Sequence, residues 1–475
     1  MNEKDLLVMK FGGTSVATPQ AMAQAVKICV DVRREWERLI VVTSALSGVT
    51  DLLVTSAERA AHGDLAAFSA AQLELNERHH TLVEKLIGDP AAQNQVHQQI
   101  DALLADFNNL CQAIHILGEA SPRALDAVAS LGERLSVRVL AAALESAGLP
   151  AQFVESTQCV VTDDHFQNAV PDMAATTRRT CQVLAPIQAA GRTPVVTGFL
   201  GATPEGITTT LGRGGSDYSA SILAVALRAN EVWIWTDVDG VMTADPRLVP
   251  EARTIPALSY REVAEMAHFG AKVLHPKSIH PAILNGIGLR VCNTFNPSHP
   301  GTRLLADREG NGRGVIKAVT AIRGLQLITL AGTGMLGVPG VAGRIFSAAA
   351  TTGISVPLII ESTSEQAICF PVPKECSQMV IRALRAHLSA EFKRGDIEQV
   401  ETSAEVDIIT VVCPGLRSTP GVAGQIFGAL GEAGINVLGI SFGASDVSIS
   451  LIVSALDTVQ ALSHLHRLTG AGEGK

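Results

Sequence analysis

The sequence predicts an α/β protein in which a layered domain is followed by two small α+β modules. Up to about residue 295, apolar strands alternate with helices, which is typical of helices packed on a largely parallel sheet. The rest of the chain contains one unit twice. In addition, a chain of 475 residues is longer than one hydrophobic core usually supports, so several domains are expected.

The elements of the layered domain follow one another from the start of the chain. An apolar run at 6–11 reads as a buried strand that ends at two glycines, and a helical pattern follows at 22–36. Residues 51–148 are helical in pattern, with breaks near 88–90 and 121–122, where proline occurs. The other expected strands are 39–44, 152–155, 193–200, 231–236 and 289–293, and the other expected helices are 173–190, 218–229 and 261–270.

The second half of the prediction depends on an internal repeat. The segment VPGVAGRIF at 338–346 returns as TPGVAGQIF at 419–427, and each copy continues through a helix to a glycine and a strand. This order of elements suits a ferredoxin-like module. The predicted limits are a catalytic domain at 1–300, a linker at 301–315 and modules at 316–400 and 401–475, and one module may be inserted in the other.

Composition excludes several classes of protein. The chain has 47% hydrophobic residues and 17% charged residues, so it is not broadly disordered. Its net charge of −9 argues against a nucleic-acid partner along the whole chain, because such binding depends on clustered Lys and Arg. Any basic site must therefore be local.

Cysteine spacing and hydropathy indicate the cellular setting. The eight cysteines are scattered without a C-x-x-C pair, so neither a disulfide framework nor a zinc site is expected, and no metal ligands are predicted. The first residues form no hydrophobic signal region, and no run of 18 uncharged apolar residues follows. We expect a soluble, cytoplasmic protein without a membrane partner.

Two patterns resemble ligand sites but are not interpreted as such. Residues 332–337 match G-x-G-x-x-G, yet the sister copy of the repeat lacks these glycines, and the unit is too short for a dinucleotide-binding fold. Residues 235–247 contain three aspartates but lack the closing glutamate of an EF-hand. The chain also has no G-x-x-x-x-G-K-[ST] phosphate loop.

Two glycine-rich turns are the best candidates for chemistry. KFGGTS at 10–15 places a lysine at the end of a strand and two glycines before a helix, where backbone N–H groups favour an anion. TTTLGRGGSD at 208–217 also precedes a helix and offers an arginine that can bind a carboxylate or phosphate through two hydrogen bonds. The plainer interpretations are a structural turn and a flexible surface turn.

Taken together, the motifs resemble the aspartate kinases of the amino acid kinase family. The resemblance covers nearly the whole chain and includes KFGGTSV at 10–16, SALSGVT at 44–50, GERLS at 132–136, WTDVDGVMTADPR at 235–247 and FGAKVLHP at 269–276. It implies an α/β/α sandwich followed by two ACT domains, the modules that bind regulatory amino acids in this family. It also implies transfer of the γ-phosphoryl group of ATP to the side-chain carboxylate of L-aspartate.

The resemblance assigns roles to individual residues. Lys10 would stabilise the transferring phosphoryl group, Asp217 would orient Lys10, Arg213 would bind a substrate carboxylate and Glu133 would meet its ammonium group. Ser44, Thr50, Gly214, Gly215 and Ser216 would line the same substrate site. The nucleotide, carrying Mg²⁺ without dedicated protein ligands, would be held by Lys10, Gly12, Gly13, Thr236, Asp237, Met242, Arg247, Lys272 and Val273, with Met242 standing where many relatives have tyrosine.

The resemblance further implies feedback control. Lysine or threonine is the expected effector, but Glu361 and Phe442 replace two glutamines of threonine-sensitive relatives, so the effector stays open. A homodimer or tetramer is expected because ACT modules usually pair. Nothing of dehydrogenase length follows residue 475, so the homoserine dehydrogenase that is fused to some relatives is expected to be absent.

Two alternatives remain. Another amino acid kinase, acting on glutamate, carbamate or a nucleotide, would lack the two modules and the segment around Glu133. A catalytically silent amino-acid sensor would not need Lys10, Arg213 and Asp217.

Overall fold

The computed structural model describes residues 5–270, 274–305, 314–335, 338–361, 366–443 and 446–470. The chain forms two compact units. The first contains residues 1–241, 254–260 and 273–306, and the second contains residues 242–253, 261–272 and 307–475. The chain therefore passes between the units several times, and the single linker at 301–315 stays a prediction.

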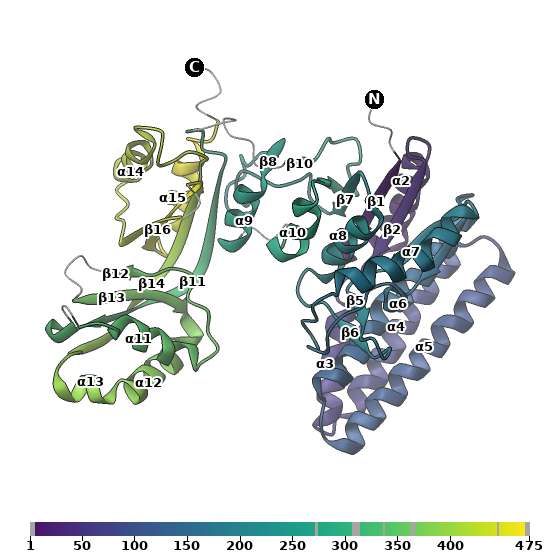
Figure 1. Ribbon diagram of the computed structural model, residues 1–475, viewed down its shortest axis with the longest axis horizontal. Helices are drawn as coiled ribbons and strands as arrows, with labels where there is room; N and C mark the ends of the chain where they lie inside the picture. The colour runs from purple at the N-terminus through teal and green to yellow at the C-terminus, as the bar shows by residue number, and fades with distance from the viewer. Residues whose placement is uncertain are drawn as a thin grey trace. The chain divides into compact units, whose positions relative to one another are not determined.

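The first unit is built on an eight-stranded sheet with the strand order β3-β4-β2-β1-β7-β9-β10-β8 (Figure 1). All neighbouring strands are parallel except β9 and β10. All six residues of the central strand β1 are buried, as expected for a strand with helices on both faces. The predicted parallel-dominant α/β fold is confirmed. The strands are β1 (Leu6–Phe11), β2 (Arg38–Thr43), β3 (Ala151–Val154), β4 (Thr193–Thr197), β7 (Glu231–Thr236), β8 (Ala257–Ser259), β9 (Gly288–Asn293) and β10 (Thr302–Leu305).

Helices make up most of the rest of this unit. They are α1 (Gly13–Val16), α2 (Pro19–Val32), α3 (Val49–Ala61), α4 (Leu65–Leu86), α5 (Pro90–Leu117), α6 (Pro122–Ser146), α7 (Met173–Ala189), α8 (Gly215–Leu227) and α10 (Pro276–Leu284), with a short 3-10 turn at Ser156–Gln158. The breaks expected at 88–90 and 121–122 separate α4, α5 and α6. Sequence reasoning missed the break between α3 and α4, where Gly63 has a φ of 91°.

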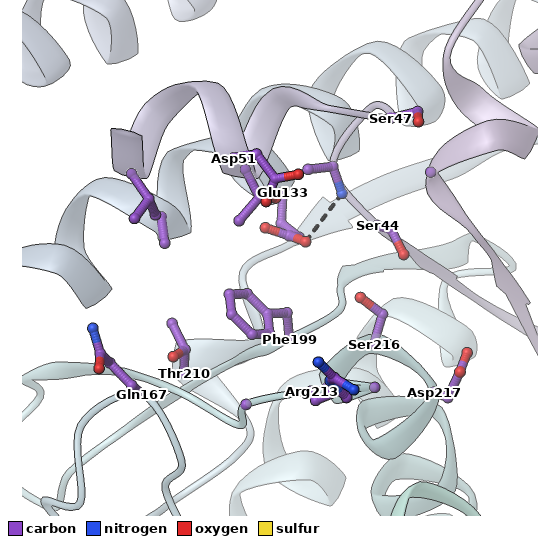
Figure 2. Close-up of a pocket in the computed structure, with 18 of the residues that line it drawn as sticks. Ser44, Ser47, Asp51, Glu133, Gln167, Phe199, Thr210, Arg213, Ser216 and Asp217 are labelled. Atoms are coloured by element: carbon purple, nitrogen blue, oxygen red, sulfur yellow. Dashed lines mark hydrogen bonds between the residues drawn. The ribbon is translucent and has the colours of Figure 1, made fainter. Parts of the chain in front are cut away.

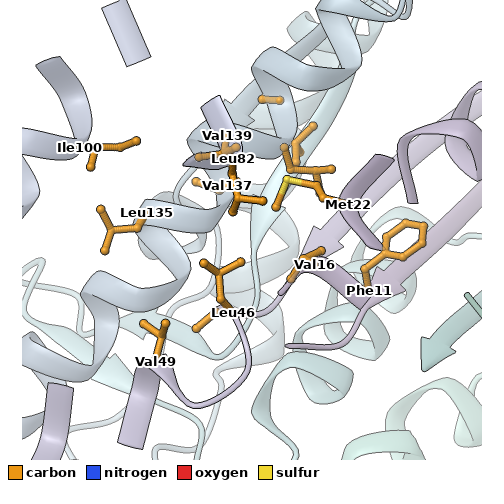
Figure 3. Packing of buried hydrophobic residues seen from close by; sticks show 14 of the residues in the cluster. Phe11, Val16, Met22, Leu46, Val49, Leu82, Ile100, Leu135, Val137 and Val139 are labelled. Carbon is orange, nitrogen blue, oxygen red and sulfur yellow. The ribbon is translucent and has the colours of Figure 1, made fainter. Parts of the chain in front are cut away.

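The core of this unit lies between α2, the helices α3–α6 and one face of the sheet. Figure 3 shows side chains from separate segments meeting there, among them Phe11, Met22, Leu46, Leu82 and Leu135. α6 is buried over most of its length and is capped by Ser121, whose hydroxyl accepts a hydrogen bond from the Ala124 N–H at 3.3 Å. A helix that is buried and capped in this way is a rigid support for side chains facing a site.

The predicted strand 193–200 is in fact two elements. β4 ends at Thr197, and β5 (Leu200–Ala202) begins after Phe199, which has a φ of 65°. β5 pairs antiparallel with β6 (Thr208–Thr210), a short strand that the sequence analysis placed inside a turn. This small hairpin leads directly into the glycine-rich turn at 211–215.

The second unit contains a six-stranded antiparallel sheet with the order β12-β13-β11-β14-β16-β15. Its strands are β11 (Ala318–Ala331), β12 (Ile360–Glu361), β13 (Ala367–Pro373), β14 (Gln399–Val412), β15 (Gly439–Phe442) and β16 (Ser448–Ser454). Its helices are α9 (Tyr260–His268, of which Tyr260 belongs to the first unit), α11 (Val341–Ala350), α12 (Ser377–His387), α13 (Ser389–Arg394), α14 (Val422–Glu432) and α15 (Thr458–His466), with 3-10 turns at Thr333–Met335 and Lys374–Cys376.

The two long strands β11 and β14 each run through both halves of this sheet. Val319 and Ile409 belong to a core with α14 and α15, whereas Ile328 and Val400 belong to a core with α11 and α12. The change of register between Ile322 and Leu325 marks the passage from one half to the other. Each half of the sheet therefore contains a segment of β11 and a segment of β14. The predicted division at residue 400 stays a prediction.

The glycine pattern at 332–337 has a packing role in its described part. A side chain on Gly332 or Gly334 would collide with the backbone around Asp396. Thr333 uses its N–H and its hydroxyl to bind Glu398. These glycines therefore allow two backbone segments to approach each other closely. Within the described residues, no helix is both long enough and apolar enough to cross a membrane.

Candidate active site

A cavity of about 610 Å³ lies in the first unit, next to the carboxyl ends of β1 and β2 (Figure 2). Its walls come from the turn after β1, the segment 44–51, α6, and the turn at 211–215 with the start of α8. It brings together ten of the residues predicted for the site: Lys10, Gly13, Ser44, Thr50, Glu133, Arg213, Gly214, Gly215, Ser216 and Asp217.

Lys10 and Asp217 form an ion pair at one end of the cavity. The Lys10 Nζ lies 2.6 Å from Asp217 Oδ1, and the two side chains are 11% and 13% exposed. Lys10 is held at the end of the buried central strand, and Asp217 lies in the first turn of α8. The ammonium group is therefore fixed in position and still faces the cavity.

Gly13 is required by close packing, whereas a side chain on Gly12 would make only ordinary contacts. A side chain on Gly13 would lie 3.0 Å from the Ala45 carbonyl oxygen, and one on Gly12 would lie 3.5 Å from Lys10 Nζ. The Gly12 N–H donates to the Trp235 carbonyl at 3.0 Å, so β7 holds the turn. Without side chains, the turn leaves room next to the lysine for another group.

Glu133 is a buried carboxyl group with an unused acceptor. Its Oε1 accepts a hydrogen bond from the Ala45 N–H at 3.0 Å, drawn as a dashed line in Figure 2. Its Oε2 is buried and has no hydrogen-bond partner among the described residues. Burial raises the pKa of Glu133 to about 8, and the Ala45 N–H and the charge of Lys10 oppose this shift. A cationic group placed at Oε2 would restore the ionised form.

Arg213 lies across the cavity from Glu133 in Figure 2. It is exposed, and no hydrogen bond or ion pair is found for its guanidinium group among the described residues. Its neighbours Gly212 and Gly214 have φ values of 76° and 71°, a backbone region that favours glycine. The Ser278 hydroxyl of α10 donates to the Gly214 carbonyl at 2.9 Å and fixes this side of the turn.

The sequence analysis missed several residues of the cavity wall, including Asp51, Asp126, Gln167, Phe199 and Thr210. Asp126 had a detectable signal, because it lies seven residues before Glu133 and so on the same face of a helix. Gln167 and Phe199 had none, since their positions depend on contacts between segments distant in sequence.

Most of the residues predicted to hold a nucleotide do not line this cavity. Thr236 ends β7 and Asp237 follows it, and the Thr236 hydroxyl donates to Asp237 at 3.2 Å. Met242 and Arg247 belong to the second unit, and Arg247 forms an ion pair with Asp245 at 2.6 Å. Lys272 and Val273 lie outside the described residues.

The arrangement has a clear chemical character. Among the described residues, a guanidinium group without a protein partner and a carboxyl group with an unused acceptor line the same cavity, together with an ammonium group that Asp217 holds in place. This set suits a small zwitterion that carries a carboxylate for Arg213, an ammonium for Glu133 and a further anionic group near Lys10.

Sequence comparisons match both halves of the chain to known families. Residues 5–293 match the model of the amino acid kinase family, and residues 328–388 and 409–468 match that of the ACT domain. The bifunctional aspartokinase/homoserine dehydrogenase 1 of Zea mays is 36% identical over 466 residues, which cover 97% of this chain and 50% of that protein. The aspartokinase of Schizosaccharomyces pombe is 30% identical, covering 98% of this chain and 92% of that protein.

Solved structures show the same likeness. Escherichia coli aspartokinase III in complex with aspartate and ADP matches with a TM-score of 0.80 and 31% identity, over 98% of this chain and 99% of that chain. The same enzyme in complex with lysine and aspartate matches with a TM-score of 0.79 and 31% identity, over 97% of this chain and 99% of that chain. The chain spans about half the length of the bifunctional plant relatives that it matches.

Proposed function

The chain belongs to the aspartokinases of the amino acid kinase family, and we propose that it transfers the γ-phosphoryl group of ATP to the side-chain carboxylate of L-aspartate. The products would be 4-phospho-L-aspartate and ADP. The observation that carries this proposal is the cavity itself, whose wall combines Arg213, the unused oxygen of Glu133 and the Lys10–Asp217 ion pair.

The two carboxylates and the ammonium group of aspartate complement the charged side chains of the cavity wall. We infer that Arg213 binds its α-carboxylate, that Glu133 accepts its ammonium group and that its side-chain carboxylate points toward Lys10. Ser44, Thr50 and the turn Gly214–Gly215–Ser216 would line the rest of the site. The nucleophile is already ionised at neutral pH, because a free aspartate side chain has a pKa near 3.9, so the reaction needs no general base.

The main barrier is electrostatic, because a carboxylate must approach a triphosphate. Catalysis then depends on positioning and on charge neutralisation. Lys10 fits the role of stabilising the transferring phosphoryl group, since its ammonium group is fixed by Asp217 and faces the cavity. The side-chain-free turn Gly12–Gly13 gives a phosphate room to approach.

The nucleotide would be ATP carrying Mg²⁺, which would supply positive charge to neutralise the phosphates. Asp217 would help to organise this complex, and no dedicated protein ligand for the ion is proposed. Thr236, Asp237, Met242, Arg247, Lys272 and Val273 remain the proposed contacts to the nucleotide. The complex of Escherichia coli aspartokinase III with aspartate and ADP supports this use of two substrates.

We further propose that the ACT domains bind lysine, threonine or both, and that they inhibit the kinase. The Escherichia coli enzyme was crystallised with lysine and aspartate, which favours lysine as the first effector to test. Glu361 is exposed on β12 and Phe442 is 46% exposed on β15, so neither side chain is buried in a core. A homo-oligomer and a place in the cytoplasm, early in lysine, threonine and methionine biosynthesis, complete the proposal.

The proposed function is tested by measuring ADP release with aspartate, while hydroxylamine traps the acyl phosphate. We expect ADP and hydroxamate in equal amounts with aspartate, much less of both with glutamate, and inhibition by lysine or threonine. ADP release without hydroxamate would show that water is the acceptor, and no aspartate-dependent ADP release would disprove the proposal.

A further inference from the structure

Asp126 is a buried carboxyl group that the proposed mechanism does not use. It lies on α6, two helical turns before Glu133, and is 1% exposed. Its oxygens accept hydrogen bonds from the Gln167 N–H at 3.0 and 3.1 Å, from the Thr210 N–H at 2.9 Å and from the Thr210 hydroxyl at 2.7 Å. Burial raises the pKa of Asp126, and these hydrogen bonds oppose the shift.

The two segments that Asp126 joins flank the turn that carries Arg213. Thr210 is the last residue of β6 and lies three residues before Arg213. On the other side, a side chain on Gly212 would lie 2.9 Å from the Gln167 carbonyl oxygen and from Asn168 Oδ1. The Leu211 N–H donates to the Phe199 carbonyl at 2.9 Å. The turn is therefore enclosed by backbone that Asp126 holds together.

The backbone around this turn is conformationally strained. Gln167 and Phe199 have φ values of 68° and 65°, and they are two of the four non-glycine residues with positive φ in the described part of the chain. Both line the cavity. Such conformations persist only where the surroundings hold them, and they are concentrated at functional sites. The Gln167 N–H donates hydrogen bonds to both carboxylate oxygens of Asp126.

We propose that Asp126 is a positioning residue for the aspartate site, an inference that rests on the proposed function. By holding Gln167 and Thr210 together, it fixes the turn and thereby directs Arg213 toward the space opposite Glu133. Because the Arg213 side chain has no partner of its own among the described residues, its direction depends on the backbone that carries it. A carboxylate suits this task, because three N–H and O–H donors converge on it and an amide would turn an NH₂ group toward some of them.

The test is the variant Asp126→Asn in the full chain, with Asp163→Asn as a matched control. Asp163 accepts hydrogen bonds from the backbone N–H groups of His165 and Val170 in the same loop but does not line the cavity. We expect Asp126→Asn to raise the aspartate KM roughly ten- to one-hundred-fold, the range that a misplaced binding group causes. The KM for ATP and the control variant should stay close to wild type.

A double-mutant cycle with Arg213→Ala separates positioning from general destabilisation. If Asp126 acts through Arg213, adding Asp126→Asn to Arg213→Ala should raise the aspartate KM little further. Independent, multiplicative effects, or an unchanged KM in an active Asp126→Asn variant, would overturn the inference. If Asp126→Asn does not fold, Thr210→Val, which removes only the hydroxyl donor, must show a smaller increase in the same KM. A wild-type chain that neither binds nor phosphorylates aspartate would instead overturn the proposed function and, with it, this inference.

Discussion

At the scale of single residues, the cavity contains carboxyl groups in very different electrostatic environments. Asp217 is paired with Lys10, Asp126 accepts four hydrogen bonds, and buried Glu133 has one oxygen without a partner in the described part of the chain. Only Glu133 has both a free acceptor and a pKa moved into the neutral range. Each environment predicts a different response to substitution.

Replacing Lys10 should remove catalysis and leave the fold intact. We expect Lys10→Ala to lower kcat by roughly 100-fold or more, comparable to the loss of one group that stabilises charge in a transition state. The exposed Lys27, substituted in the same way, is the control. Near-normal turnover in Lys10→Ala, with an unchanged circular dichroism spectrum, would contradict the role proposed for this lysine.

Glu133 should make aspartate binding depend on pH. Its carboxyl group is largely protonated below a pKa of about 8 and must ionise to bind an ammonium group, so the aspartate KM should fall as the pH rises from 6 to 9. Glu133→Gln should raise the KM and remove this dependence. A rise in pH has the opposite effect on stability, because it weakens the contribution of Glu133 to the free energy of unfolding. Because the folded-state pKa lies above the ordinary value of 4.5, this group lowers the free energy of unfolding as the pH rises from about 4.5 to about 8.

Arg213→Lys should mainly raise the aspartate KM, because an ammonium group cannot form the two parallel hydrogen bonds of a guanidinium group with a carboxylate. Steady-state kinetics with each substrate varied in turn would measure this. A change confined to the KM for ATP would place Arg213 at the nucleotide instead.

At the scale of elements, a histidine pair joins α4 and α5. The Nδ1 atoms of His80 and His97 are 2.8 Å apart, and His80 Nε2 lies 2.9 Å from Asp101 Oδ1. One Nδ1 must donate and the other accept, so the contact does not tolerate two protonated rings. Burial and the neighbouring His80 lower the pKa of His97, while Asp101 and Glu84 oppose this shift.

This contact predicts a loss of stability in acid. The folded-state pKa of His97 lies below the unfolded value, so its contribution to the free energy of unfolding is lost as the pH falls through that range. We expect His97→Gln to reduce the fall in Tm between pH 7 and pH 5, whereas the exposed His62→Gln should not. The buried His79, with its pKa lowered to about 4, will keep part of the dependence.

At the scale of the whole molecule, the second unit should unfold as one body. Because β11 and β14 each contribute to both of its cores, damage to one core should weaken the other. We expect Leu384→Ala in α12 and Leu430→Ala in α14 each to cost roughly 2–5 kcal/mol and to lower the same calorimetric transition. Two separate transitions that respond to one variant each would show that the halves are independent.

The net charge of −9 can be compared with the charged residues of the cavity wall. The cavity wall holds Lys10 and Arg213 alongside Asp51, Asp126, Glu133 and Asp217. That Arg247 and Lys272 join these cations in one cleft stays a prediction, because Arg247 belongs to the second unit and Lys272 lies outside the described residues. What distinguishes this site is therefore the placement of its charges.

The order of amino acids was enough to predict the class of fold, the repeat, the family and ten residues that line the cavity. Short stretches of sequence are sufficient to predict these features, because buried parallel strands are continuous apolar runs and glycine-rich turns follow them directly. Strand 193–200, by contrast, was predicted as one element because nothing in its composition marks the positive φ of Phe199.

The contacts that hold distant segments together are visible only in the folded chain. Asp126 and Thr210 are 84 positions apart in the chain, yet they share hydrogen bonds that enclose the turn of Arg213. Likewise, the β11 and β14 segments that share a core are widely separated in sequence. Such contacts depend on the path of the whole chain, and no local pattern encodes them, because a hydrogen bond requires only that two groups meet in space.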